Sequence, residues 1–236
     1  MKNYITINND YFEILIPSSF KNYGEEVLNY STDKIKEFLS FFKEQSHEKI
    51  RGAFLINHDD FIDRIKEVSA PNSPLPPKWA TGCFYGGEIQ ILLNANNPYE
   101  KFNTLTHEGF HLLFSKFVYE KNNIDRIVWL DESLASNFDG STDKLIKDNI
   151  FENIIIKLMN NSKLPKMNEL SFLKGNIVTK EYNGYDLFKV VGRYLIETKT
   201  KNNLLKYIND KEKVINDGEN ILEKSLNYFI LKYNLL

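Results

Sequence analysis

The sequence predicts an α+β fold, with a small mixed β-sheet in residues 1–95 and a mainly helical part in residues 96–236. One observation is that strand signals, which are short apolar runs between turn residues, end near Asn94. Another is that apolar residues recur almost wholly at helical spacing from Trp129 onward. The third is composition, because 236 residues that are 42% hydrophobic and 26% charged suit one globular domain or two small lobes. We expect the two parts to form one unit together.

Four short runs in the first part predict strands. The segments 4-YITI-7 and 11-YFEILI-16 flank a polar triplet and predict a β-hairpin. The run 50-IRGAFLIN-57 predicts a third strand. In 86-GGEIQILLN-94, two glycines lead into a fourth.

Helices and a stiff loop separate these strands. Apolar residues at helical spacing predict a helix from Tyr23 to Glu44. The segment 59–68 predicts a short helix with an acidic start, which we expect His58 to cap. Four prolines in 71-PNSPLPP-77 are incompatible with regular structure and predict a loop.

The second part is predicted to begin with a long helix. Asn97 is the expected cap and Pro98 the first helical residue. The helical pattern continues to about Asn122, where a turn is expected. A second helix then begins near Trp129.

Charge and cysteine content restrict the class of protein. The net charge of −2 gives no basic surplus that would favour nucleic acid or an anionic membrane as a partner. Cys83 is the only cysteine, so a disulfide within the chain is impossible, and we expect it to be a small buried residue. The first 17 residues lack the continuous apolar run of a signal peptide, and no stretch approaches the roughly 18 apolar residues that cross a bilayer. We therefore expect a cytoplasmic protein; the sequence leaves its oligomeric state open.

The stretch 106-THEGFHLLF-114 holds two of the four histidines in the chain. His107 and His111, at positions i and i+4, share one face of a helix, so both imidazoles can reach one metal ion. Imidazole nitrogen suits zinc, whose catalytic sites use three protein ligands and a water molecule. Glu108 lies about 100° around the helix from His107, where it can take a proton from bound water. This H-E-x-x-H motif predicts one zinc ion per chain in a site that activates water.

The third ligand has to come from another element, and the candidate is Glu132, with Asp131 as its rival. Both acids lie at the start of the helix expected after the turn near Asn122. Asp139, two helical turns after Glu132, can accept a hydrogen bond from a ligand histidine or can simply be an acid at a helix end. Gly109 costs roughly 1 kcal/mol of helix propensity relative to alanine, so we expect another backbone to approach closely there.

Together with 129-WLDESLA-135, the H-E-x-x-H motif resembles the gluzincin metallopeptidases, the group that includes aminopeptidase N and thermolysin. The aminopeptidase-like branch has W-L-N-E-G-F-A at this place, so Asp131 and Ser133 are departures from its pattern. The resemblance covers roughly residues 80–200. It implies a thermolysin-like (zincin) catalytic fold.

The resemblance also implies roles for individual residues. Glu132 rather than Asp131 is the implied zinc ligand, and Asp139 matches an acid of the same branch. Tyr185, with Tyr182 as the runner-up, matches the tyrosine whose hydroxyl donates to the developing oxyanion.

One stretch before the zinc helix both resembles the branch and departs from it. The segment 82-GCFYGGEIQILLN-94 resembles the strand at the edge of the cleft in these enzymes, and we expect 88–94 to align an extended peptide. The branch carries G-x-M-E-N there, whose glutamate grips the substrate amine. This chain lacks that string, and Glu88 is the only acid present between residues 80 and 91. The resemblance is therefore to an endopeptidase-like unit more than to a classical aminopeptidase.

These observations predict a zinc metallopeptidase that hydrolyses peptide bonds in a peptide or protein substrate. Two alternatives stay open. One is a zinc-binding module without catalysis that acts as a partner or regulatory protein. The other is a small-molecule hydrolase on the same scaffold, which the missing amine anchor leaves possible.

Overall fold

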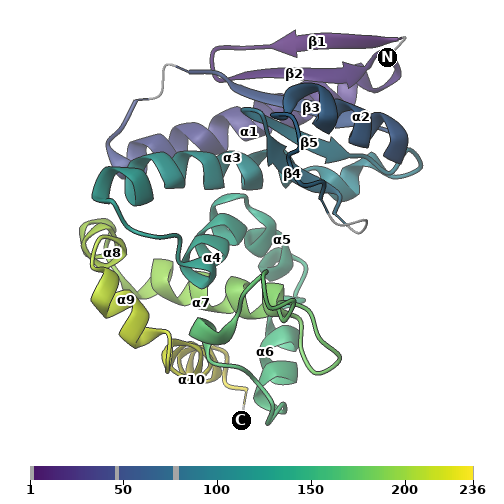
Figure 1. Cartoon of the computed structure of the whole chain (residues 1–236). Coiled ribbons are helices and arrows are strands. Elements are labelled where there is room, and N and C mark those ends of the chain that lie inside the picture. Colours follow the sequence, from purple (N-terminus) through teal and green to yellow (C-terminus); the bar gives the residue numbers. More distant parts are fainter. Residues whose placement is uncertain (1–2, 46–47, 77–79, 236) are drawn as a thin grey trace. The chain divides into compact units, whose positions relative to one another are not determined.

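The computed structural model describes residues 3–45, 48–76 and 80–235 of the chain (Figure 1). The chain divides into two compact units, Met1–Leu112 and Leu113–Leu236. The expected division after residue 95 falls inside the first unit, whereas the observed one lies within helix α3 (Thr104–Phe114). Five strands and many helices confirm the predicted α+β class.

The first unit is built on a mixed five-stranded sheet with the order β1-β2-β3-β5-β4. β1 and β2 pair antiparallel, which confirms the predicted hairpin, and β3 is parallel to both β2 and β5. The strands are β1 (Tyr4–Asn8), β2 (Phe12–Pro17), β3 (Ile50–Leu55), β4 (Gly82–Tyr85) and β5 (Glu88–Leu92).

Helices cover both faces of this sheet, as the alternation of side chains along β3 requires. On one face, the ring of Phe54 lies 6.1 Å from that of Tyr23 on helix α1 (Lys21–Phe42). On the other, Ala53 and Leu55 form a buried cluster with Phe61 and Ile65 of helix α2 (His58–Val68). The N-terminal part of α3 lies on the α1 face, where a Cβ built on Gly52 would be 3.1 Å from Leu105.

Of the two predictions for the segments that flank α2, the loop is confirmed and the helix cap is wrong. Residues 71–76 contain only a turn, as the prolines predict, and Pro77 lies outside the described residues. His58 does not cap α2, because Asn57 has the extended backbone of a cap and its side chain accepts from the N–H of Asp60 at 2.8 Å. His58 is instead the first helical residue.

The stretch predicted as one cleft-edge strand folds as the β4-β5 hairpin. Gly86 and Gly87 have φ values of +57° and +77° and form a tight turn that only glycine enters easily. β5 pairs with β3 on one side and β4 on the other, so the expectation that 88–94 is an edge is wrong. The edge strand is β4.

The predicted long helix is also divided. Its start is the 3-10 turn η2 (Pro98–Lys101), and the Asn97 side chain donates to Glu100 at 3.0 Å instead of capping the backbone. After α3, the segment Ser115–Glu120 (η3) is π-helical, a form that is rare and often lies at functional sites.

Every described element of the second unit is a helix or a helical turn. Helix α7 is central to it, with Leu187, Val191 and Leu195 fully buried. It packs against α4, whose Trp129 and Leu134 are also buried (Figure 1). The helices are α4 (Val128–Phe138), α5 (Ser141–Lys147), α6 (Phe151–Met159), α7 (Gly184–Thr198), α8 (Lys201–Ile208), α9 (Lys211–Asp217) and α10 (Ile221–Tyr233), with a 3-10 turn η4 (Met167–Glu169). None of the described helices is both long and apolar enough to cross a membrane.

Candidate metal centre

The two histidines of α3 point their ring nitrogens at one another. The Nε2 atoms of His107 and His111 are 3.1 Å apart, and the rings stand edge to face with centroids 4.7 Å apart. Two imidazoles on one tetrahedral zinc, each with a bond of about 2.05 Å, hold their nitrogens about 3.3 Å apart. The observed spacing is therefore close to that of a shared metal ion.

The opposite face of α3 is anchored in the first unit. The hydroxyls of Thr106 and Ser31 are 2.8 Å apart in a buried hydrogen bond, and the ring of Phe110 lies 4.8 Å from that of Phe38. These contacts fix the rotation of the helix. They leave His107, Glu108 and His111 half-buried on its other side.

Gly109 does not meet another backbone. A Cβ built there would lie 3.4 Å from Ile50, 3.6 Å from Ile35 and 3.9 Å from Phe12, and all three contacts are with side chains. These are ordinary packing distances. The expectation of a close backbone approach at Gly109 is therefore wrong.

Glu108 lies beside the edge strand β4. A Cβ built on Gly82 would be 3.5 Å from Oε1 of Glu108, which places this carboxylate in the immediate neighbourhood of β4. Cys83 is half-buried next to it, with its thiol 3.7 Å from the side-chain oxygen of Gln90. Burial, together with the negative charge of Glu108, raises the pKa of the Cys83 thiol to about 12. Cys83 is thus a neutral thiol at physiological pH.

Glu132 completes a group of three possible ligands. One ligand atom from each of His107, His111 and Glu132 lies within 4.8 Å of the other two. Among the residues that the structure describes, this group includes Glu132 and not its neighbour Asp131. Two imidazole nitrogens and one carboxylate oxygen are a ligand set that zinc accepts, so the residues present fit this metal.

An arginine that sequence reasoning missed joins both acids of α4. Nη2 of Arg126 donates to Oε1 of Glu132 at 2.8 Å, and its Nε donates to Oδ2 of Asp131. Burial by itself lowers the pKa of Arg126, but the two carboxylates outweigh it and the pKa lies above its ordinary value. The sequence did contain a signal for this pairing. A basic residue stands shortly before two acids, and both acids belong to the buried part of the helix.

Asp139, Tyr185 and Tyr182 lie in the second unit. Asp139 is the C-cap of α4 and accepts from the N–H of Ser141 at 2.7 Å, so it does serve as a helix-end acid. Tyr185 is half-buried in the first turn of α7, with its ring edge to face with Phe188. The hydroxyl of Tyr182 donates to the carbonyl of Asn176 at 2.9 Å. This bond engages Tyr182 in its own loop.

Glu88 is held by an arginine inside the first unit. It is 2% exposed, and Arg64 donates to both of its carboxylate oxygens, at 2.8 Å and 2.5 Å. These bonds raise the pKa of Arg64 well above its ordinary value. Glu88 is therefore a buried partner of Arg64.

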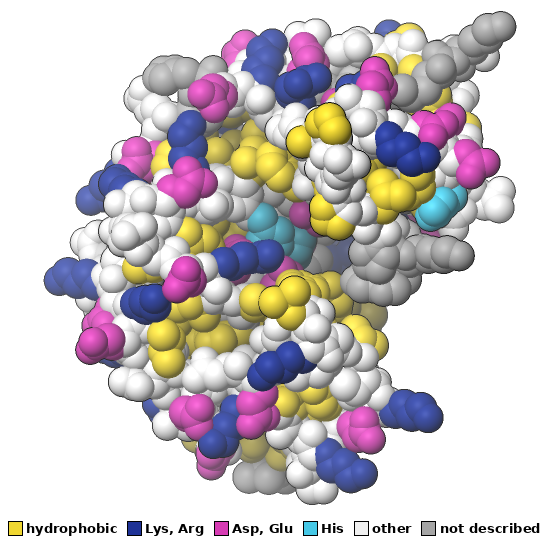
Figure 2. Space-filling model, in the orientation of Figure 1, with side chains coloured by type: hydrophobic (Ala, Val, Ile, Leu, Met, Phe, Trp, Pro, Cys, Tyr) yellow, Lys and Arg dark blue, Asp and Glu magenta, His cyan; other side chains and the backbone are white. Residues whose placement is uncertain are grey.

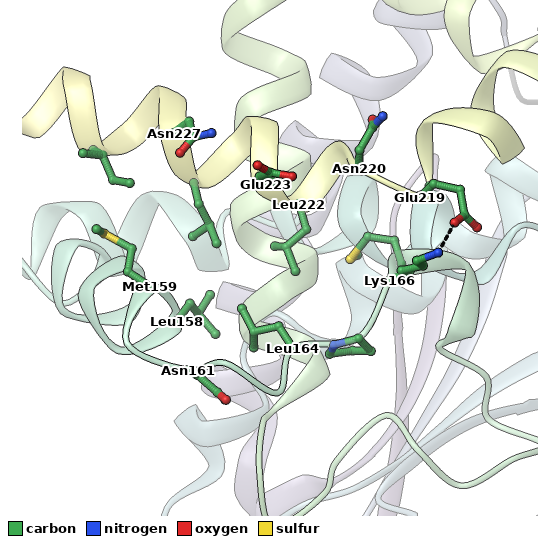
Figure 3. Close-up of a pocket in the computed structure, with 15 residues that line it drawn as sticks. Leu158, Met159, Asn161, Leu164, Lys166, Glu219, Asn220, Leu222, Glu223 and Asn227 are labelled. Carbon is green, nitrogen blue, oxygen red and sulfur yellow. Dashed lines mark hydrogen bonds and ion pairs between the residues drawn. The ribbon is translucent and has the colours of Figure 1, made fainter.

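A hollow of about 430 Å³ lies within the second unit, beside α6 and α10 (Figure 3). Apolar side chains such as Leu158 and Leu222 line it, and Lys166 forms an ion pair of 2.5 Å with Glu219 at its margin. Its described lining contains neither histidine nor cysteine. The hollow therefore offers none of the nitrogen or sulfur ligands of a zinc site.

The surface carries charges of both signs. On the face drawn in Figure 2, Lys and Arg side chains alternate with Asp and Glu, and histidine side chains are visible. An even mixture of this kind gives no extended basic patch on that face, in agreement with the net charge of −2.

No protein-family model and no solved structure matches the chain. Gamma aminobutyrate transaminase 2 of Solanum lycopersicum is 33% identical over 66 residues. The matched part is 28% of this chain, which spans 14% of the length of that protein. A match of this extent does not define a family for the chain.

Proposed function

We propose that this chain is a zinc-dependent metallopeptidase with a thermolysin-like catalytic arrangement of the gluzincin type. The observation that carries the proposal is the ligand group on α3 and α4. One ligand atom from each of His107, His111 and Glu132 lies within 4.8 Å of the other two. The glutamate of the same motif, Glu108, is half-buried beside β4.

Each residue has one role in the proposed reaction. His107, His111 and Glu132 would hold zinc, which when bound polarises the scissile carbonyl and lowers the pKa of its water toward about 7. Glu108 accepts the proton of the attacking water and passes it to the leaving amine. Tyr185 donates a hydrogen bond to the oxyanion of the tetrahedral species.

The structure also bears on the type of peptidase. A classical aminopeptidase of the resembling branch needs a carboxylate that binds the substrate amine, and Glu88 is already neutralised by Arg64. This supports an endopeptidase-like enzyme acting on a peptide or protein. The competing proposals are a catalytically inactive zinc-binding module and a small-molecule hydrolase. Comparing turnover of peptides with turnover of esters and epoxides distinguishes a peptidase from a small-molecule hydrolase.

The decisive experiment pairs zinc content with turnover on the same preparations. Wild type, purified without metal-affinity steps, should contain one zinc per chain and cleave members of a broad peptide library. Glu108→Gln should retain the zinc and lose roughly 10²–10⁴-fold in turnover, because glutamine cannot act as a base. Glu223→Gln, which alters an exposed glutamate on α10, should retain both.

Three results would count against the proposal. If wild type contains almost no zinc, and added zinc does not restore it, the proposed metal site is wrong. A loss below tenfold in Glu108→Gln with zinc retained removes Glu108 as the base. Zinc-loaded wild type that cleaves no peptide supports the binding module.

A further inference from the structure

We propose that Arg126 is a positioning residue for Glu132, and that Asp131 holds Arg126 in place. This inference rests on the proposed zinc site. Arg126 precedes α4 and binds the two adjacent carboxylates of its first turns through different nitrogens, Nη2 to Glu132 and Nε to Asp131. A planar guanidinium can make two such bonds in fixed directions, which a lysine cannot.

Burial makes this arrangement energetically important. The side chains of Asp131 and Glu132 are 2% and 4% exposed, whereas that of Arg126 is 45% exposed. Neighbouring buried carboxylates repel one another and are costly to keep charged without a partner. The guanidinium of Arg126 gives both buried carboxylates a charged hydrogen-bond partner.

The bond from Arg126 also orders the ligand. A glutamate side chain loses rotamer freedom when it is fixed, and a group already held in one geometry binds its partner with less loss. The bond from Arg126 to Oε1 restrains the Glu132 side chain in this way. Residues that orient a ligand in this way typically change metal affinity by about 10–100-fold when removed.

Neighbours hold the arginine itself. The hydroxyl of Tyr119 donates to the carbonyl of Ile127 at 3.3 Å, which ties down the residue after Arg126. The ring of Phe172 lies 5.9 Å from the guanidinium, within the range of a cation–π contact. Asp131, which stands where the resembling branch has asparagine, thereby acquires a role, since its charge anchors Arg126.

The test measures the zinc dissociation constant of the full chain by competition with a chromophoric chelator. Arg126→Ala should raise this constant about 10–100-fold. Arg126→Lys keeps the positive charge but cannot make both directed hydrogen bonds, so its zinc dissociation constant should lie between those of wild type and Arg126→Ala. Asp131→Asn should also weaken zinc, by less than Arg126→Ala, because it acts through the arginine.

Arg193 provides a matched control. It also binds two acids, Asp143 at 2.8 Å and Glu197 at 2.7 Å, but it belongs to α7 and neither acid is a candidate ligand. Arg193→Ala should change the zinc dissociation constant by less than threefold. An equal loss in Arg193→Ala and Arg126→Ala would show a general effect on folding and overturn the proposal.

Failure of the positioning role and failure of the zinc site give different results. If Glu132→Ala loses zinc while Arg126→Ala binds it within threefold of wild type, Arg126 does not position the ligand. If wild type itself binds no zinc, the proposed function fails. The role of Arg126 is then decided in metal-free protein by a double-mutant cycle that measures the unfolding equilibrium. Coupling of about tenfold between Arg126→Ala and Glu132→Gln in the unfolding equilibrium constant supports it, and additivity overturns it.

Discussion

Replacing Gly192 by alanine should destabilise the second unit and displace the helix that carries Glu132. Gly192 lies in α7, where a Cβ would be 2.0 Å from the carbonyl oxygen of Ser133 and 2.3 Å from the side-chain nitrogen of Asn137. Real Cβ atoms essentially never come closer than 3.0 Å to another heavy atom, so the helices must separate by about 1 Å. Ser133 is the next residue after Glu132, so the same shift moves the candidate ligand.

Three contributions decide the magnitude. Overpacking of a close contact costs about 1–3 kcal/mol, and this contact involves backbone that cannot rotate away. The amide of Asn137 donates to the carbonyls of Ser133 and Lys189 at 2.9 Å and 3.2 Å, and each bond contributes about 1 kcal/mol. Alanine returns about 1 kcal/mol of helix propensity. The net loss in the free energy of unfolding is about 2–4 kcal/mol.

The assay is equilibrium unfolding in urea followed by circular dichroism at 222 nm. Gly192→Ala should lower the free energy of unfolding, while Gly109→Ala serves as the control. Gly109 is also helical, but its added Cβ meets side chains at 3.4 Å or more, so alanine there should be neutral or stabilising by up to about 1 kcal/mol. A Gly192→Ala protein within 0.5 kcal/mol of wild type would refute the close approach of α4 and α7.

Further predictions concern single residues. Glu132→Ala should weaken zinc binding sharply and Asp131→Ala less, which chelator competition measures; the reverse order would overturn the ligand assignment. Tyr185→Phe should lower kcat for peptides with little effect on zinc content, whereas Tyr182→Phe should change stability more than kcat; equal kcat values for Tyr185→Phe and wild type would remove its role. The pKa of Cys83 is raised to about 12, against about 8.5 in an unfolded chain, so far less of the reactive thiolate is present at pH 8. Alkylation of Cys83 by iodoacetamide at this pH should therefore be more than about a hundredfold slower in folded protein. Equal rates in folded protein and in urea would contradict this environment.

The sequence determined those features that depend on local spacing. The interval between His107 and His111 places both imidazoles on one helix face whatever surrounds the helix, and their Nε2 atoms are 3.1 Å apart. The alternation along β2 predicted that Phe12 and Ile14 are buried and that Glu13 between them is exposed. The shift from strand to helix signals near Asn94 likewise predicted where the sheet ends, and the last strand ends at Leu92.

Tertiary structure decided the features that depend on partners distant in sequence. A run such as 86–94 reads as a strand whether it is central or at an edge, and only its pairing with β3 and β4 made it central. Glycines at 109 and 192 look alike in a helical pattern, yet only Gly192 faces the backbone of another helix. Arg126 is close in sequence to its partners Asp131 and Glu132, but separations of five and six residues are not helical spacings, so helical periodicity did not predict these bonds. Local propensity fixes which face a residue occupies, but packing alone decides what that face meets.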